Sequence, residues 1–331
     1  MYFNSSKMMT IIIMMLSIIL CLSSNSWMIM WISMEINMFM FITLLNQKSL
    51  FSSESLMKYF FIQTISSLIL FMAIMIIWNS NNSNNFYILI MNLCLLMKLS
   101  SAPFHFWFIQ IIESMNWLNF YLISTTQKII PLVLLNFNMN LFMITIFTLL
   151  NFIMSAPSGL NQNSLKKILG YSSINHLGWM ILTLNINESL WYLYMTSYLL
   201  ILATISFMFN YMNISYMNQM FYFNNFFLNL MFFSLTFLSL GGIPPFMGFI
   251  PKWMTINFLI MNNQLFMLMI MMMSSLTVLF FYIQPLYTNL LMNSLKNKWF
   301  INMNLVNMKF IIFNLIYLSL FTFIIMLIMY I

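Results

Sequence analysis

The sequence predicts an all-α integral membrane protein with about eleven transmembrane helices. Three observations predict this fold class: 63% of the 331 residues are hydrophobic, only 5% are charged, and the apolar residues form long runs between short polar segments. A soluble domain carries roughly 25% charged residues, whereas a membrane-spanning helix needs about 20 apolar residues. The composition therefore excludes a soluble protein and leaves no room for an extramembrane domain.

The apolar runs place the expected helices along the chain. The first run follows one lysine, as in a signal peptide, but no small-residue cleavage site comes after it, so we interpret it as a span. The expected spans are residues 8–24, 27–45, 57–78, 86–107, 119–136, 140–157, 164–184, 189–212, 226–250, 255–283 and 309–330.

Lysine placement tests the count of eleven, because loop lysines collect on the non-translocated side of a membrane. With eleven spans, eight of the eleven lysines fall on the side that holds the N-terminus: Lys7, Lys48, Lys58, Lys166, Lys167, Lys296, Lys298 and Lys309. The opposite loops, such as residues 79–85, are uncharged apart from Glu188. We therefore expect the N-terminus to face the negative compartment, which is the matrix or the cytoplasm.

The other three lysines and a few further ionisable residues fall within apolar runs or at their ends. These are Glu35, Lys98, His105, Lys128, His176 and Lys252. At about 1.5 Å per residue, four of them lie near mid-membrane, while Lys252 is closer to an edge. A charge at that depth costs a few kcal/mol, so the set indicates an ion pathway. The alternative for Lys98 is a helix-end lysine that snorkels to the headgroups.

Two of the expected spans are interrupted. Pro103 follows Lys98 in the fourth span, and the ninth span contains Gly241, Gly242, Pro244 and Pro245 ahead of Lys252. Proline removes a backbone donor, and broken helices mark transport sites. Because the two breaks are five spans apart, we expect inverted repeats at about residues 1–138 and 139–285, followed by a loop and terminal helix at 286–331.

Other chemistries receive less support from the sequence. Cys21 and Cys94 lie in apolar runs and are expected to be buried free thiols, too few for an iron–sulfur cluster. No glycine stands in a dinucleotide-binding pattern. His105 and His176 have three readings: satisfied core histidines, proton relays, or the ligands of a haem.

Four stretches resemble a known family. They are Lys98–Trp107 (KLSSAPFHFW), Gln127–Pro131 (QKIIP), Ser164–Trp179 (SLKKILGYSSINHLGW) and Leu238–Trp253 (LSLGGIPPFMGFIPKW). They are similar to the mitochondrial NADH dehydrogenase subunit 2 family, whose members are antiporter-like subunits of the respiratory complex I membrane arm. The resemblance runs from the second span to the ninth. The Ile-, Phe-, Met- and Asn-rich composition, without Arg or Asp, is typical of an A+T-rich genome such as an insect mitochondrion.

The resemblance implies eleven helices, inverted five-helix repeats and one discontinuous helix in each repeat. It also implies that Glu35 pairs with Lys98, that Lys128 is a relay lysine, and that Lys252 belongs to the channel of the second half. The chain departs from the family in two places. Ser100 replaces a common glycine, and Ile109-Gln110 replaces a common Pro-Glu pair.

These observations predict a proton-translocating subunit of the mitochondrial inner membrane, coupled to electron transfer in other subunits. The resemblance implies that NADH, FMN, iron–sulfur clusters and ubiquinone bind to those subunits and that this chain carries no cofactor. The expected partners are neighbouring antiporter-like subunits and phospholipids, and no nucleic acid. Three alternatives remain open from the residues: a stand-alone cation/proton antiporter, a haem-bearing membrane anchor, and a structural scaffold.

Overall fold

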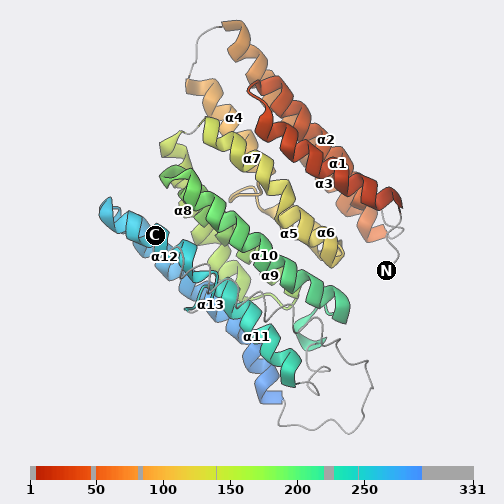
Figure 1. Ribbon diagram of the computed structural model, residues 1–331, viewed down its shortest axis with the longest axis vertical. Helices are drawn as coiled ribbons and strands as arrows, with labels where there is room; N and C mark the ends of the chain where they lie inside the picture. Colours follow the sequence, from red (N-terminus) through yellow and green to blue (C-terminus); the bar gives the residue numbers. More distant parts are fainter. Residues whose placement is uncertain are drawn as a thin grey trace.

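The structure, a computed structural model, describes residues 5–45, 50–80, 85–138, 140–219, 227–244 and 246–292. Within these residues the chain forms a bundle of thirteen α-helices. Figure 1 shows their arrangement, and the only β-contact among the described residues is an isolated bridge between Ser164 and Tyr216. The helices are α1 Ser5–Ser23, α2 Trp27–Leu45, α3 Leu50–Ser80, α4 Asn85–Lys98, α5 Phe106–Ser114, α6 Trp117–Ser124, α7 Thr126–Phe137, α8 Leu141–Leu160, α9 Leu165–Ile186, α10 Glu188–Met212, α11 Phe227–Gly241, α12 Phe249–Met261 and α13 Leu265–Met292.

The bundle is built in chain order from one edge to the other. In Figure 1, α1–α3 form one edge, α4–α7 and α8–α10 form the centre, and α11–α13 form the opposite edge. Lys58 and Glu113 line one cavity, and Lys166 and Lys167 both contact Glu113, so these three lysines lie at the same end of the bundle. This grouping agrees with the distribution of lysines expected from the sequence. Lys48, Lys296, Lys298, Lys309 and the expected eleventh span lie outside the described residues.

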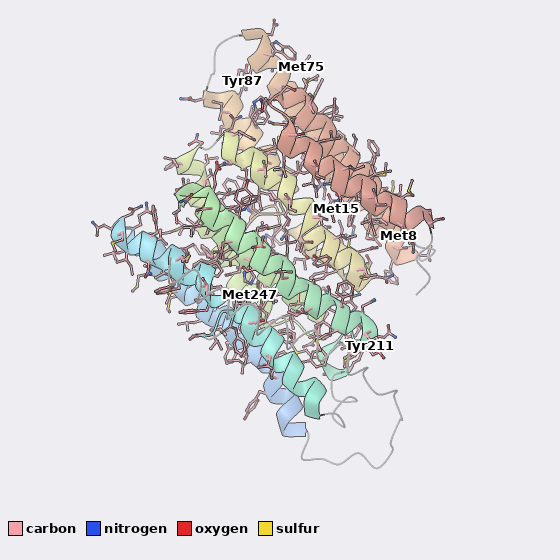
Figure 2. All side chains as sticks on the ribbon, viewed as in Figure 1. Met8, Met15, Met75, Tyr87, Tyr211 and Met247 are labelled. Carbon is pink, nitrogen blue, oxygen red and sulfur yellow. The ribbon has the colours of Figure 1, made fainter. Side chains whose placement is uncertain are left out.

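The outer surface is apolar, as a lipid-facing surface must be. Met8 and Met15 on α1 are 45% and 44% exposed, and Figure 2 shows them on the periphery of the bundle. By length and composition alone, seven helical segments of the described chain are suited to cross a membrane, and shorter apolar helices complete other passes. The fold class expected from the sequence is thereby confirmed.

Helix α9 is the centre of the bundle and is buried along most of its length. Its glycines let neighbouring helices approach closely: a Cβ on Gly178 would stand 2.8 Å from the Phe152 ring of α8, and one on Gly170 would meet Ile109 of α5 at 3.0 Å. Small residues are the usual means of close helix packing in membranes, where apolar side chains gain little by leaving lipid. A residue on α9 is therefore held by neighbours on every side.

Several of the expected span boundaries were wrong, and the third pass already begins at Leu50 rather than at 57. The fourth pass continues beyond residue 107 through α5 to Ser114. The ninth pass continues beyond residue 250 through α12 to Met261, and the tenth begins at Leu265 rather than at 255. Lys252 had suggested a boundary because lysine is common at membrane edges. Here its side chain is buried instead, inside the second half of a broken helix.

A third interruption, which the sequence analysis did not predict, divides the fifth pass. Helix α6 ends at Ser124 and α7 starts at Thr126, with Thr125 at φ −124° and ψ −77° between them. Thr125 and Thr126 donate hydroxyl hydrogen bonds back to the carbonyls of Tyr121 and Leu122. Pro131 has no N–H for the carbonyl one turn earlier. The interruption leaves polar backbone beside Lys128, which lies in the first turn of α7.

Candidate functional site

The helices that precede the two expected breaks, α4 and α11, end in the same way. At the end of α4, the Ser101 amide donates to Leu96 and the Ser100 amide to Met97, with Ser100 at φ 59°. At the end of α11, the Ile243 amide donates to Leu238 and the Gly242 amide to Ser239, with Gly242 at φ 79°. Both are Schellman caps, in which one left-handed residue satisfies the last carbonyls of a helix.

The first break places Lys98 opposite Glu35. Lys98 is the last residue of α4, and its Nζ lies 3.9 Å from Glu35 Oε1 on α2 and 3.9 Å from the Met34 sulfur. The Lys98 side chain is only 4% exposed. Glu35 Oε1 is buried and has no hydrogen-bond partner. The pair is thus electrostatically coupled but longer than a hydrogen bond, so a small movement of α2 makes or breaks the contact.

Lys128 is buried at the third interruption without a carboxylate. All four glutamates of the chain lie in the described residues, and none is within ion-pair distance of it. Its Nζ donates to the Ser173 carbonyl of α9 at 3.3 Å and lies 5.0 Å from the centre of the Phe108 ring. A desolvated cation over an aromatic face gains electrostatic attraction, which partly offsets its lost hydration.

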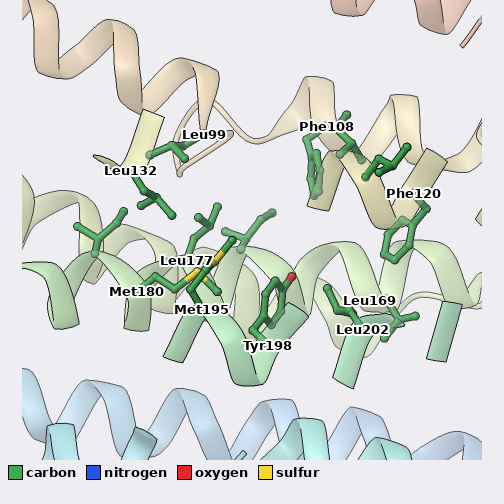
Figure 3. Packing of buried hydrophobic residues seen from close by; sticks show 14 of the residues in the cluster. Leu99, Phe108, Phe120, Leu132, Leu169, Leu177, Met180, Met195, Tyr198 and Leu202 are labelled. Carbon is green, nitrogen blue, oxygen red and sulfur yellow. The ribbon is translucent and has the colours of Figure 1, made fainter. Parts of the chain in front are cut away.

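His176 lies on α9 and is buried among tyrosines of α10. Its Nδ1 is 2.7 Å from the Tyr194 hydroxyl, its ring is 5.0 Å from that of Tyr198, and its Nε2 has no hydrogen-bond partner. Lys128 and Lys252 both lie within electrostatic range of the ring. Apolar side chains, including Leu177, Met180 and Met195, pack around this region (Figure 3). The histidine is therefore a titratable group in a dry setting between two buried lysines.

Lys252 lies in the first turn of α12 and reaches back across the second break. Its Nζ donates to the Gly241 carbonyl, at the end of α11, at 2.9 Å, and lies 5.7 Å from the Trp179 ring. Its side chain packs on Gly242, where a Cβ would stand 3.0 Å from Lys252 Cδ. Carbonyls at a helix C-terminus carry partial negative charge. Both breaks therefore place an ammonium group at the C-terminal end of a half-helix.

The structure brings Glu35 and Lys98 together at one end of the set and groups Lys128, His176 and Lys252 around α9. His105 is buried at the first break: it precedes α5, packs on Phe106 and on Tyr171 of α9, and has no hydrogen-bond partner for Nδ1. The two histidines contact different aromatic neighbours, so the haem reading gains no support. The described residues contain no cluster of three or more potential metal-ligating side chains.

Pro103 and Pro244 lie in the two breaks as expected, whereas Pro245 falls outside the described residues. Cys21 and Cys94 are buried free thiols, which confirms that prediction.

Sequence analysis missed several polar neighbours of the lysines. Asn151 of α8 accepts a hydrogen bond from the Ala102 amide at 2.5 Å and so supports the first break. Gln127 donates to Asn37 at 2.9 Å and accepts from the Tyr59 hydroxyl at 3.2 Å. Tyr198 lies beside Ser173, and its buried hydroxyl group has no hydrogen-bond partner among the described residues. Only Gln127 had a usable signal, because it directly precedes Lys128.

Comparisons with known proteins agree with this geometry. Residues 24–277 match the family described as NADH:quinone oxidoreductase/Mrp antiporter, transmembrane. The chain is 40% identical over 307 residues to NADH-ubiquinone oxidoreductase chain 2 of Anopheles gambiae, covering 90% of this chain and 89% of that one. Its identity to the Aedes aegypti protein of the same name is 38% over 289 residues, covering 85% of each.

A solved structure of respiratory complex I from Thermus thermophilus contains a chain with the same fold. The TM-score is 0.79 at 18% sequence identity, and the match covers 86% of this chain and 71% of that one. At this identity the likeness concerns the fold alone.

Proposed function

Because the chain belongs to the NADH:quinone oxidoreductase/Mrp antiporter transmembrane family, we propose that its buried lysines carry protons across the membrane within a respiratory NADH:ubiquinone oxidoreductase. The chain is an antiporter-like subunit of the membrane arm of that complex, and electron transfer takes place in other subunits. The observation that carries the proton proposal is the set of three buried lysines, of which only Lys98 has a carboxylate within 4 Å.

The Glu35–Lys98 pair acts as the switch in this mechanism. Burial disfavours a charged lysine, and a nearby carboxylate favours it. When Glu35 approaches, Lys98 holds its proton; when Glu35 withdraws, Lys98 releases it. Because the two side chains are 3.9 Å apart and Glu35 Oε1 has no competing hydrogen bond, the attraction between them is sensitive to small displacements. A conformational change in a neighbouring subunit is thereby converted into proton movement.

The proton then passes along the centre of the bundle. Lys128 takes it from Lys98, and His176 passes it towards Lys252. Two contacts support this order. Lys128 donates a hydrogen bond to the carbonyl of Ser173, almost one turn before His176, and Lys252 lies over the ring of Trp179, almost one turn after His176. His176 is flanked by two cations, so it accepts a proton most readily after one lysine has lost its charge. His105 is a lesser member of the pathway, at the first break.

The remaining assignments follow from the same proposal. Residues 1–138 and 139–285 form the two repeats. The loop and terminal helix expected at 286–331 lie outside the described residues beyond Met292, where α13 ends. The chain lies in the mitochondrial inner membrane with its N-terminus in the matrix, beside other antiporter-like subunits and phospholipids. NADH, FMN, iron–sulfur clusters and ubiquinone are held by other subunits, and this chain holds none of them.

Lys98→Met in the assembled complex tests the proposal. Methionine keeps the length of the side chain and removes its charge, so the rate of proton transfer through this chain should fall by roughly a hundredfold, the lower end of the loss expected for a proton-transfer group; the complex should then lose this chain's share of the protons pumped. Protons translocated per electron pair are measured in sealed vesicles, after a native gel has shown assembly. Lys7→Met, at an exposed lysine, is the matched control. Undiminished pumping and quinone-linked turnover in the Lys98 variant would refute the mechanism.

The second candidate is a stand-alone cation/proton antiporter, which the family's description also covers. The two candidates differ in what accompanies the chain. Membership of the oxidoreductase requires co-migration with a flavin- and iron–sulfur-containing assembly in a mild-detergent native gel, whereas the antiporter is active as an isolated polypeptide. An active, lone polypeptide in proteoliposomes would favour the antiporter.

A further inference from the structure

A large cavity opens at the lysine-bearing end of the bundle. We call it the vestibule; it has a volume of about 680 Å³, and its walls include Glu54 and Lys58 of α3, Gln110 and Glu113 of α5, and Tyr216. Polar and apolar side chains both line it, and its three charged lining residues form two ion pairs: Glu54 with Lys58 at 2.7 Å and Glu113 with Lys167 at 2.9 Å. Gln110 occupies the position where the resembling family commonly has glutamate. The vestibule thus presents exchangeable groups to the compartment on that side.

A second, much smaller cavity lies between the buried lysines. We call it the lysine cavity; it has a volume of about 10 Å³, and Lys98, Lys128 and Gln127 are among its lining residues, together with Tyr59 and Trp107. A single water needs about 10–15 Å³ of such space and two to four polar partners. The lysine cavity is therefore about the size of one water, and its polar walls suit that water.

The two cavities follow one another along the same pair of helices. On α3, Ser55 lines the vestibule and Tyr59 lines the lysine cavity; on α5, Gln110 lines the vestibule and Trp107 the lysine cavity. Four and three residues correspond to about 6 and 4.5 Å along a helix axis. The lining residues of the vestibule and of the lysine cavity thus lie within about one helical turn of each other on both helices.

Two aromatic side chains, Tyr59 of α3 and Trp107 of α5, line the lysine cavity on these two helices. Their ring centres are 6.1 Å apart, and their exposures are 2% and 8%. Phe41 of α2 packs on the far side of Tyr59 at 5.1 Å. The two rings are therefore packed together and almost fully buried.

The polar atoms of the two rings make them more than packing residues. The Tyr59 hydroxyl donates to Gln127, the neighbour of Lys128. Trp107 Nε1 is buried and has no hydrogen-bond partner in the part of the chain that is described. An unsatisfied buried donor costs about 1–3 kcal/mol, and water between the rings would remove that cost. The closed conformation is therefore poised to admit water.

From these contacts we propose that the vestibule is the site of proton uptake and that Tyr59 and Trp107 form a gate between it and the lysine cavity. When the rings separate, water joins the vestibule to Lys98 and Lys128; when they close, the lysines exchange protons only with each other and with the far half. This inference rests on the proposed function, because it supplies protons to the same lysines. It adds the side of uptake and the residues that control it.

Thiol labelling tests the gate independently of pumping. Ser100→Cys places a thiol in the lysine cavity, which Ser100 lines, and a small water-soluble maleimide is added from the lysine-bearing side of the assembled complex. Labelling at position 100, read by mass spectrometry, should be slow when Trp107 is intact and at least tenfold faster in the Trp107→Ala background. Ser114→Cys, in the vestibule wall, is the matched control and should react quickly in both backgrounds.

Two conservative variants separate the rings from their polar atoms. Trp107→Phe keeps an aromatic barrier and should leave Ser100→Cys protected, which shows that faster labelling in Trp107→Ala does not come from misfolding. Tyr59→Phe also keeps the barrier but removes the hydroxyl beside Gln127, so labelling should stay slow while protons translocated per electron pair fall.

The outcomes distinguish the gate from the proposed function. Equal labelling rates with tryptophan and alanine at position 107 would overturn the gate, whether both rates are fast or both slow. Pumping lost in Lys98→Met together with such equal rates would leave the proton pathway standing and refute only the gate. Fast labelling in Trp107→Ala together with undiminished pumping in Lys98→Met would refute the proposed function instead.

Discussion

The two broken helices share a backbone design and differ in how they hold a lysine. Helices α4 and α11 end in the same capping motif, with Leu96 and Leu238 accepting the long hydrogen bond. Taking these leucines as equivalent positions, 142 residues apart, Lys98 corresponds to Leu240 and Lys252 to Gln110. Each break therefore has one lysine, but it precedes the first break and follows the second.

The partners of the two lysines differ more than their positions. Lys98 faces a carboxylate, Glu35, on a neighbouring helix at 3.9 Å, whereas Lys252 bonds the Gly241 carbonyl of its own broken pass at 2.9 Å. A carboxylate on another helix moves when that helix moves, and a backbone carbonyl at the end of the same pass does not. This difference indicates that the first break contains the switch, because the partner of Lys98 can move. The second break is a fixed relay, because the partner of Lys252 belongs to the same pass.

Glu35→Gln removes the switch and should have the largest effect on this comparison. The amide keeps the shape of the side chain but leaves Lys98 as a buried charge without a carboxylate, a change that costs about 3–5 kcal/mol when one partner of a buried pair is lost. Lys98 should shed its proton to avoid that cost, and proton pumping in the assembled complex should fall steeply. Glu188→Gln, at an exposed glutamate that accepts from Asn136, should pump normally. Normal pumping by Glu35→Gln would show that the two halves do not differ as argued.

Gly242→Ala should be the most damaging change at the fixed relay. Gly242 has φ 79°, and a Cβ there would stand 3.0 Å from Lys252 Cδ and 3.1 Å from the Gly248 carbonyl. A left-handed alanine costs about 1–2 kcal/mol, and overpacking adds about 1–3 kcal/mol. We expect a lower melting temperature for the purified complex and weaker pumping.

Gly170→Ala is the matched control for that variant. It lies in ordinary helix, and its Cβ would meet the flexible ends of the Ile109 and Ile112 side chains at 3.0 and 3.2 Å and the Phe108 ring at an ordinary 4.0 Å. Its melting temperature should fall less. If the complexes with the two glycine variants have the same melting temperature, the close packing of Lys252 on Gly242 does not stabilise the second break.

Which residues belong to the site could be predicted from the sequence better than how those residues are arranged in space. Charged residues are so few, at 5% of the chain, that each one inside an apolar run is conspicuous, and proline and glycine mark two of the breaks. The break at Thr125 gave no such mark, because serine and threonine hydroxyls bond to helix carbonyls in unbroken helices as well. Lys252 suggested a membrane edge, since only the fold shows that its side chain turns back to Gly241.

The aromatic residues around the path were beyond the reach of the sequence for another reason. The chain contains 15 tyrosines and 9 tryptophans, and nothing in their spacing separates Tyr59, Tyr194 or Trp107 from those that face lipid. Their importance arises from contacts between helices far apart in the chain, such as that of Tyr59 with Gln127, 68 residues away. Pattern within one helix does not encode such contacts.

Asn151→Ala tests a side-chain support of the first break. The side chain of Asn151 on α8 accepts the Ala102 amide at 2.5 Å, so its loss leaves a buried donor unpaired at a cost of about 1–3 kcal/mol. The melting temperature of the complex should fall, and pumping should fall with it as Lys98 loses its fixed position. Asn175→Ala, which removes only a 3.3 Å hydrogen bond to Ser155, should have a smaller effect. A larger effect of Asn175→Ala would place the support elsewhere.

Ser100→Gly should have the smallest effect, and it is the one change expected to stabilise the complex. Ser100 holds φ 59° at the capping position where the second break has Gly242, and glycine adopts that conformation without the steric cost that serine pays. The relief is about 1–2 kcal/mol, reduced by about 0.4–1 kcal/mol because glycine gives the unfolded chain more freedom. A small rise in melting temperature is therefore expected, with pumping retained. Ser101→Gly, which removes the hydroxyl bond to the Leu96 carbonyl at 2.9 Å, should shift it downward. If both serine variants lower the melting temperature, the Ser100 hydroxyl stabilises the complex by more than its left-handed backbone costs. The capping residues Ser100 and Gly242 would then not be interchangeable.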